Sequence, residues 1–220
     1  MLGIKKKSSA TKRMSRVPTI CNIVFAGQLN SEVDLEQSAR ALVDSHVILE
    51  QRSYTEFSAM FLRMPLARDA MIVFANGRFV VTGVVDDVSA QRLLSRYLPH
   101  LRTVGGGTAT ISQIVLTNIT AKLDMDARVD VGALLALQHG VDTSLAFRSR
   151  AIKIAIVGSG TAVVFETGQI IFTGARNENQ LRAFADSIVA RISNFVLART
   201  ETSGDADFVM VDALESALHL

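Results

Sequence analysis

The chain has 220 residues, 49% of them hydrophobic, which is enough for a sizeable core in one or two domains. Its 23 Lys and Arg residues nearly balance its 21 Asp and Glu residues, so binding to nucleic acid through charge alone is not expected. No apolar run approaches the ~18–20 residues of a membrane span, and the single Cys21 excludes an internal disulfide and a cysteine-based zinc site.

The charges concentrate at the two ends of the chain. Residues 1–16 contain six Lys or Arg and no acid, whereas residues 201–220 contain five acids and no Lys or Arg. We expect a disordered basic tail over 1–16 and an acidic tail over 201–220, in which 207–220 has the pattern of a short amphipathic helix. The basic tail suits a nuclear-localisation or DNA-contacting role, or that of a solubilising leader, and the sequence leaves both open.

In chain order, the first half of the body reads as strands with two helices. Apolar patterns predict strands over 19–27, 47–51, 57–64, 71–74 and 78–82. A short helix over 35–42 begins after Asp34, whose side chain suits an N-cap. A longer helix over 87–98 is expected to end where Pro99 removes a backbone N–H.

The second half follows the same order after Gly105-Gly106-Gly107, which we interpret as the joint between halves. Strands are predicted over 110–117, 147–156, 161–165 and 169–173, with a helix from Asp130 to about residue 137 and a final helix over 178–198. A phosphate-binding loop is the alternative for the glycines, but no Lys-Ser or Lys-Thr pair follows them.

An internal repeat relates the two halves. Residues 70–83, AMIVFANGRFVVTG, recur as 161–174, TAVVFETGQIIFTG, and each copy has a hairpin turn before its second strand. Five landmarks correspond at an offset of 90–91: Asn22-Ile23-Val24 with Gln113-Ile114-Val115, Phe57 with Phe147, Arg63 with Lys153, Phe74 with Phe165, and Thr82-Gly83 with Thr173-Gly174. One further segment, Val33-Asp34-Leu35, fits Val129-Asp130-Val131 better, at an offset of 96. We therefore expect half-domains over 17–104 and 105–200 that form one fold.

Both alternating faces of the repeated hairpin are apolar. Met71 and Val73 would point to one side of the sheet, and Ile72 and Phe74 to the other. An antiparallel sheet normally has one solvated face, and the predicted helices are too few to cover both. The sequence therefore predicts an exposed apolar face, which is typical of a binding surface.

Taken in this order and at this period, these landmarks resemble the TATA-box-binding protein family and its related factors, over about residues 17–195. The resemblance implies an α+β saddle of two pseudo-symmetric repeats. In that fold a curved antiparallel sheet of about ten strands lays its concave side on the DNA minor groove, with helices on the convex back. It also implies a nuclear transcription initiation factor that bends promoter DNA and assembles with TFIIB-like and TFIIA-like factors and the RNA polymerase machinery.

The resemblance also implies roles for particular residues. Phe57 with Phe74, and Phe147 with Phe165, match the pairs that wedge between bases at the two ends of the DNA site. Asn22 and Gln113 match amides that read minor-groove acceptors. Sugar and base-edge contacts fall to Val24, Val80, Thr82, Val115, Ile171 and Thr173, and phosphate contacts to Arg63, Arg68 and Lys153. Taken singly, each residue has an ordinary alternative: a core phenylalanine, a strand-forming side chain or a solvated charge.

The second half departs from the family pattern beside Phe147, because Arg148 and Arg150 stand where a small apolar segment is usual. This favours a divergent member with an altered contact to TFIIB-like factors. No catalysis, cofactor or metal is expected, because the four histidines lie far apart in the sequence and no paired carboxylates stand out. Two alternatives stay open: a protein-interaction scaffold whose apolar face holds a DNA-mimicking protein segment, and a binding module with a closed cavity.

Overall fold

The computed structural model describes residues 17–42, 48–53, 58–63, 67–104, 106–107, 109–136 and 150–197. Predictions for the two tails, Phe57 and Phe147 lie outside these residues. Within them, the first half contains β1 (Thr19–Leu29), α1 (Leu35–Leu42), β2 (Ile48–Ser53), β3 (Ser58–Arg63), β4 (Ala70–Phe74), β5 (Arg78–Val84) and α2 (Asp87–Val104). The second half contains β6 (Ile111–Asp124), β7 (Arg128–Val129), α3 (Val131–Ala136), β8 (Ala151–Ile156), β9 (Gly160–Phe165), β10 (Gln169–Ala175), α5 (Glu178–Ile192), a 3-10 turn (Ser193–Phe195) and β11 (Val196–Leu197).

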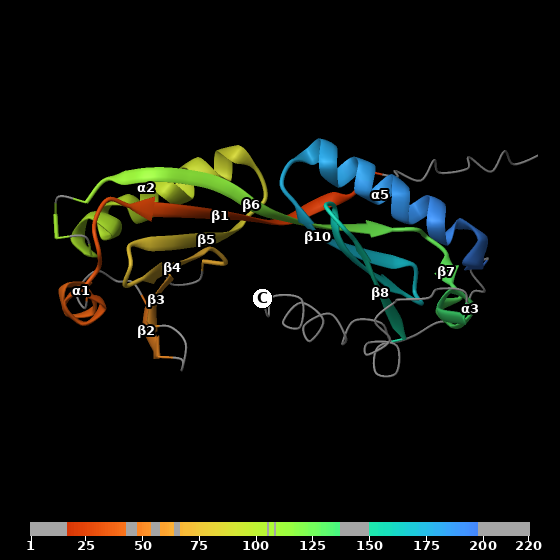
Figure 1. The fold of residues 1–220 in the computed structure, drawn as a ribbon, viewed down its shortest axis with the longest axis horizontal. Coiled ribbons are helices and arrows are strands. Elements are labelled where there is room, and N and C mark those ends of the chain that lie inside the picture. Colours follow the sequence, from red (N-terminus) through yellow and green to blue (C-terminus); the bar gives the residue numbers. More distant parts are fainter. Residues whose placement is uncertain are drawn as a thin grey trace, which may run out of the picture.

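One antiparallel sheet runs through both halves. Its nine described strands have the order β2-β3-β4-β5-β1-β6-β10-β9-β8, and β7 with β11 forms a separate small pair. The strands β1 and β6 run in opposite directions through the centre of the molecule (Figure 1). The outer strands hang below the two ends of this central pair in the same view, so the side away from α2 and α5 is concave. The predicted α+β saddle is confirmed.

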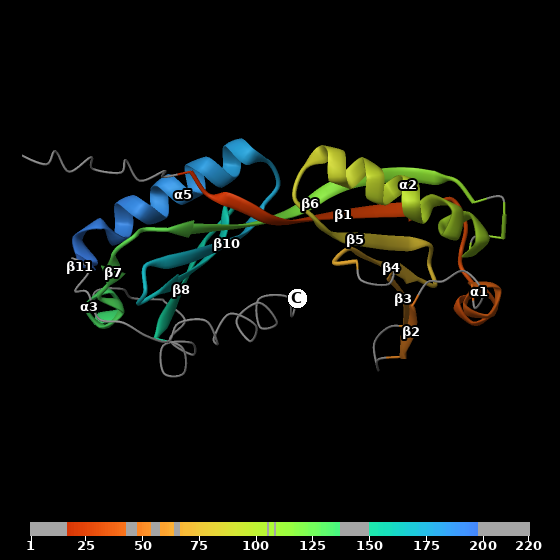
Figure 2. The same ribbon diagram turned by 180° about the vertical axis from the view of Figure 1, so that it is seen from behind.

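Helices α2 and α5 lie on the same side of the sheet, one over each half (Figure 2). Under α2, Leu93 and Tyr97 pack in one buried core with Phe79 of β5. Under α5, Phe184 meets Phe172 of β10 edge to face, with the ring centroids 5.5 Å apart, in a second core. Two partly buried residues at the centre, Ile20 and Leu116, contact both cores and so join the halves.

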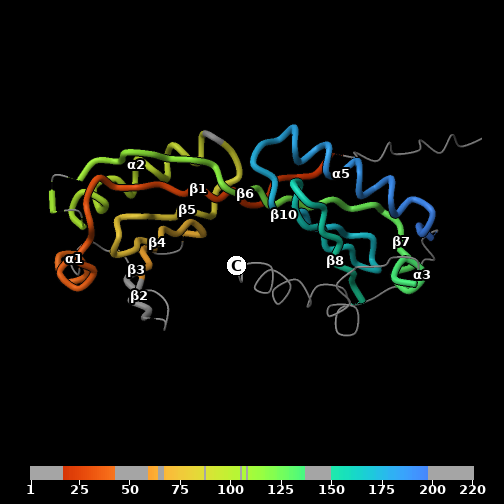
Figure 3. Tube along the Cα trace, viewed as in Figure 1, coloured from red at the N-terminus to blue at the C-terminus, as the bar shows by residue number. Residues whose placement is uncertain are grey.

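A pseudo-twofold axis passes between β1 and β6, where Ile23 pairs with Ile119. On either side of this pair the register is mirrored: Asn22 pairs with Thr120, and Val24 with Asn118. The two strands therefore correspond at an offset of 96 residues. Figure 3 shows the two halves as similar traces related about this centre.

Two β-bulges in the β1–β6 pair, one in each strand, are related by the pseudo-twofold axis, and β6 has a further register shift at Ser112. Cys21 is the extra residue of β1 and Thr117 that of β6. The Cys21 thiol donates to the Thr120 carbonyl at 3.4 Å, and the Thr117 hydroxyl donates to the Val24 carbonyl at 3.1 Å. Partial burial raises the pKa of the Cys21 thiol, although the nearby ammonium of Lys122 opposes that shift.

The predicted helix starts and hairpin turns are confirmed. The Gln37 N–H donates to the Asp34 carboxylate at 2.9 Å, and the Ala133 N–H donates to that of Asp130 at 2.9 Å, so both acids cap their helices. In the hairpins, Gly77 and Gly168 have φ values of 78° and 87°, the conformation that their turns require.

Three predicted boundaries were wrong. Helix α2 continues through Pro99 to Val104, because Pro99 lies on the exposed side while Leu101 and Val104 are buried beyond it. Strand β6 continues past residue 117 to Asp124, because the bulge at Thr117 keeps it paired with both β1 and β10. Helix α5 ends at Ile192, and the chain turns back so that Val196 pairs with Val129.

Candidate nucleic-acid interface

The concave face carries most of the residues that the sequence singled out. In β5, Phe79 and Val81 are buried beneath α2, so Val80 and Thr82 point to the other side of the sheet. The same alternation holds in the neighbouring strands. It places on the concave face Asn22, Val24, Arg63, Phe74, Val80, Thr82, Gln113, Val115, Lys153, Phe165, Ile171 and Thr173. Arg68 is exposed in the loop before β4.

Next to the pseudo-twofold axis, Asn22 has a fixed orientation. Its side-chain oxygen accepts the backbone N–H of Gly83 at 2.8 Å and the Thr82 hydroxyl at 3.1 Å. Because a backbone N–H can only donate, the amide must turn its oxygen toward Gly83 and its NH2 group away. The NH2 group of Asn22 has no hydrogen-bond partner among the described residues, so it remains able to donate to a ligand on this face.

The symmetric partner of Asn22 is Asn118, and the predicted correspondence with Gln113 is wrong. The Asn118 oxygen accepts the backbone N–H of Gly174 at 2.6 Å and the Thr173 hydroxyl at 3.3 Å, which repeats the contacts of Asn22. Gln113 instead lies opposite Gln28, further from the axis, and is exposed. The Asn118 NH2 group also lies 3.2 Å from the Thr173 hydroxyl, so it is less free than that of Asn22.

The two described phenylalanines of the predicted wedge pairs occupy equivalent positions. Phe74 pairs with Ala59 across β3 and β4, and Phe165 pairs with Ala151 across β8 and β9. Phe74 is partly buried. Phe165 is only 8% exposed and packs with Ala151 and Val163 in a small apolar cluster on the concave face. Insertion between bases would therefore require the Phe165 ring to leave this cluster.

The predicted correspondence between Arg63 and Lys153 is also wrong. Lys153 pairs with Val163 of β9, and the equivalent pair in the first half joins Phe61 to Ile72. Lys153 therefore stands in the position of Phe61, while the counterpart of Arg63 is Ala155. The β8–β9 hairpin of the second half is shorter than the β3–β4 connection, so a constant sequence offset does not hold across it.

The first half of the chain also matches a known protein family. A family model described as "Transcription factor TFIID (or TATA-binding protein, TBP)" matches residues 17–104. The TATA-box-binding protein of Saccharomyces cerevisiae is 25% identical over 199 residues, which cover 87% of this chain and 77% of that protein. That of Pyrobaculum aerophilum is 23% identical over 190 residues, covering 84% and 90% respectively. The chain is therefore similar to TATA-box-binding proteins over most of its length.

A solved structure of a TATA-box-binding protein has a similar fold. The structure of Methanococcus jannaschii TBP superimposes with a TM-score of 0.63 at 17% sequence identity, over 81% of this chain and 99% of that one. The family model itself covers the first half only.

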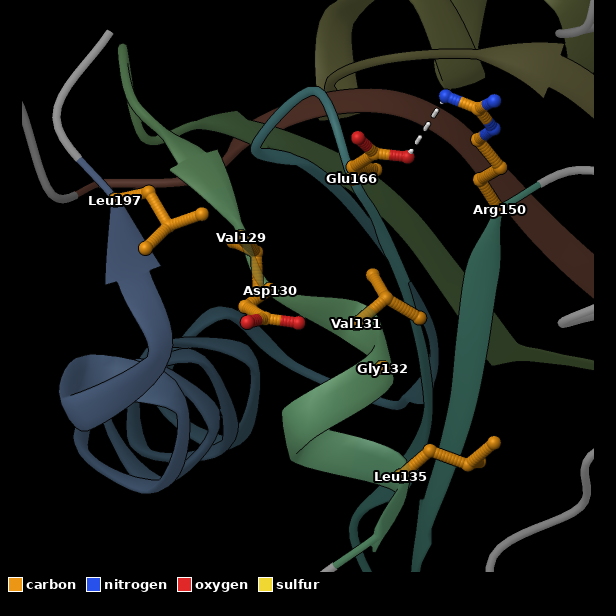
Figure 4. A pocket seen from close by; sticks show the side chains of 8 residues that line it. All are labelled: Val129, Asp130, Val131, Gly132, Leu135, Arg150, Glu166 and Leu197. Carbon is orange, nitrogen blue, oxygen red and sulfur yellow. Dashed lines mark hydrogen bonds and ion pairs between the residues drawn. The ribbon is translucent and has the colours of Figure 1, made fainter.

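A pocket of about 480 Å³ lies in the second half beside β7, α3 and β11, and Figure 4 shows the side chains that line it. Its lining combines apolar side chains of β7, α3 and β11 with a charged rim, in which Glu166 accepts from Arg128 and Arg150. Sequence reasoning gave no signal for this pocket. Among the described residues, no group of His, Cys, Asp and Glu is arranged to hold a metal ion. None of the described helices is long and apolar enough to span a membrane.

Proposed function

We propose that this protein is a member of the TATA-box-binding protein family and a transcription initiation factor that binds promoter DNA with its concave face in the minor groove. The observation that carries the proposal is the pair Asn22 and Asn118, whose amides are fixed symmetrically on an apolar sheet face that no described helix covers. TATA-box-binding proteins are the relatives that this chain resembles over most of its length. The chain acts as a DNA-binding factor rather than an enzyme.

The fixed amides suit A·T base pairs. In the minor groove these pairs present only acceptors, adenine N3 and thymine O2, whereas guanine adds an N2 amino donor. An amide whose oxygen is already occupied by Gly83 or Gly174 offers only its NH2 group, which can donate to an acceptor but would face a second donor at guanine. Val24, Val80 and Ile171 beside the amides supply apolar contact with sugars and base edges.

The phenylalanine pairs complete the proposal. Phe57 with Phe74 at one end, and Phe147 with Phe165 at the other, insert between base steps and bend the DNA. Arg63, Arg68 and Lys153 add contacts to phosphates. The convex helices α2 and α5 face away from the DNA and are therefore available to TFIIB-like and TFIIA-like factors and the polymerase machinery in the nucleus.

Fluorescence resonance energy transfer across an end-labelled duplex measures binding and bending together. The chain should bind and bend an A·T-rich duplex more strongly than a G·C-rich control, with a shallow dependence on salt because apolar contacts contribute much of the affinity. Binding that depends steeply on salt and produces no bend would contradict the proposal and favour the protein-interaction scaffold.

The bending role of the wedge pair has its own test. The double variant Phe57→Ala with Phe74→Ala should lose bending together with affinity, because a methyl group cannot replace a neighbouring base in the stack. Val88→Ala, on the exposed side of α2, is the control and should bend DNA normally. Normal bending by the double variant would exclude the wedge role at that end.

A further inference from the structure

The two halves of the concave face differ in one row of side chains. In the first half, paired strands align five apolar residues across the face: Val115, Ala26, Val80, Ile72 and Phe61. The symmetry-related row of the second half contains Thr19, Lys122, Ile171, Val163 and Lys153. Two lysines therefore stand where the first half has Ala26 and Phe61.

Both lysines point toward the concave side. Lys122 lies between Ala121 and Leu123, which are buried in the core under α5, so its own side chain is on the opposite face and exposed. Lys153 lies between Ile152 and Ile154, which are buried in the same core. Three strand spacings separate the two lysines, a distance of about 14 Å.

Neither lysine forms an ion pair within the described part of the chain. The nearest acid on this side of β6 is Asp124, one row further from the pseudo-twofold axis, and its carboxylate accepts the Asp126 N–H at 2.8 Å. The corresponding position in the first half is Gln28, opposite Arg78. In this next row the charge difference has the opposite sign, because Gln28 and Arg78 correspond to Asp124 and Gln169, so the excess of positive charge in the second half is confined to the inner row with the lysines.

We infer that Lys122, supported by Lys153, sets the direction in which the protein lies on an asymmetric DNA site. The inference rests on the proposed minor-groove function. An A·T minor groove is narrow and strongly negative, and it attracts cationic side chains. At a G·C pair the guanine amino group adds a donor at the groove floor and opposes an ammonium group. The second half should therefore lie on the more A·T-rich half of a site, and the first half, whose inner row is apolar, on the other.

Single-molecule energy transfer can count the two orientations. The duplex carries a site that is A·T in one half and G·C in the other, with an acceptor dye at one end. The donor dye is attached at Ser95→Cys, which is exposed on α2 in the first half, in a full-length chain with Cys21→Thr. Threonine is chosen because Thr117 occupies the symmetric bulge. Two transfer efficiencies then report the two orientations.

In the labelled chain, most molecules should place the second half on the A·T side. Lys122→Ala should reduce the ratio of the two populations by about threefold to fivefold, the scale of one partly exposed ionic contact. The exchange variant Ala26→Lys with Lys122→Ala should invert the ratio, because it moves the charge across the pseudo-twofold axis. Raising the salt concentration should weaken the preference of the labelled chain.

Two controls separate charge from other effects. Lys122→Arg should keep the ratio, and Arg182→Ala, which removes a charge from α5 on the other side of the sheet, should not change it. Equal populations in the labelled chain, or a ratio that Lys122→Ala leaves unchanged, would overturn the inference while leaving the proposed function intact. Absence of binding to the duplex, measured by fluorescence anisotropy, would overturn both.

Discussion

At the scale of single residues, the side-chain oxygens of Asn22 and Asn118 accept hydrogen bonds that an aspartate oxygen would also accept. Asn118→Asp keeps an acceptor for the Gly174 N–H and the Thr173 hydroxyl, so the thermal midpoint of unfolding should change little. The variant replaces the donor with a carboxylate in a groove lined by acceptors. We expect at least about a tenfold loss of affinity for A·T-rich DNA, the scale of one lost base contact.

The matched control is Gln113→Glu, which makes the same amide-to-acid change further along β6. Because Gln113 lies away from the asparagine pair and is exposed, this variant should lose clearly less affinity than Asn118→Asp. Affinities from fluorescence anisotropy at one fixed salt concentration provide the comparison. A larger loss of affinity for Gln113→Glu would show that Gln113 contacts the bases, and it would contradict the symmetry of the site.

The same pair shows where sequence reasoning about the site stopped. Gln113-Ile114-Val115 matched Asn22-Ile23-Val24 at the offset of the hairpins, yet Asn118-Ile119 is the structural equivalent. The bulge at Thr117 adds one residue, which turns both Gln113 and Asn118 to the concave side, so alternation alone does not distinguish them. The better fit of Val129-Asp130 at an offset of 96 was the signal that could have identified Asn118.

At the scale of elements, the β9–β10 turn depends on Gly168. Its φ is +87°, and an added Cβ would lie 1.7 Å from the Ala127 carbonyl oxygen. This oxygen belongs to the backbone, so relieving the clash requires a shift of the main chain. Gly158 in the β8–β9 turn has a similar φ of +79° but open space around it. Gly158→Ala should therefore cost only the ~1–2 kcal/mol of a left-handed alanine.

Gly168→Ala adds the clash to that conformational cost and should destabilise the fold by a further amount of about 1–3 kcal/mol. Chemical denaturation of both variants measures the difference between them. Equal destabilisation would mean that the β9–β10 turn shifts away from Ala127 without cost. Hairpin turns of this kind were predictable, because Asn-Gly and Thr-Gly stand between β-forming runs. The continuation of α2 past Pro99 was not, since it depends on the burial of Leu101 and Val104 by the sheet.

At the scale of the whole molecule, the central strands make the halves dependent on each other. Ile119 is 1% exposed at the pseudo-twofold axis, and the neighbouring Leu116 contacts both cores. Ile119→Ala should lower the free energy of unfolding by about 2–5 kcal/mol and keep a single urea transition. Hydrogen exchange should show protection falling in β4 and β9 alike. A biphasic transition, with loss confined to one half, would show that the halves unfold separately.

The architecture as a whole followed from the repeat and from the two apolar faces of its hairpin. What the repeat could not reveal was which differences between the halves matter, because Lys122 and Ala26 correspond only at the offset of the central strands. A constant offset of 91 pairs Lys122 with Ser31, outside the strands. The difference in charge between the two inner rows could therefore be recognised only from the strand register.

The pseudo-twofold axis lies within one chain, and this affects the symmetry of the DNA sites that the protein can prefer. A dimer of identical subunits presents the same surface twice, so its preferred site reads the same in both directions, like a palindrome. In a duplicated and fused chain, each copy mutates independently. A substitution of alanine by lysine then changes one half of the binding face alone. The protein can therefore prefer one orientation on an asymmetric site.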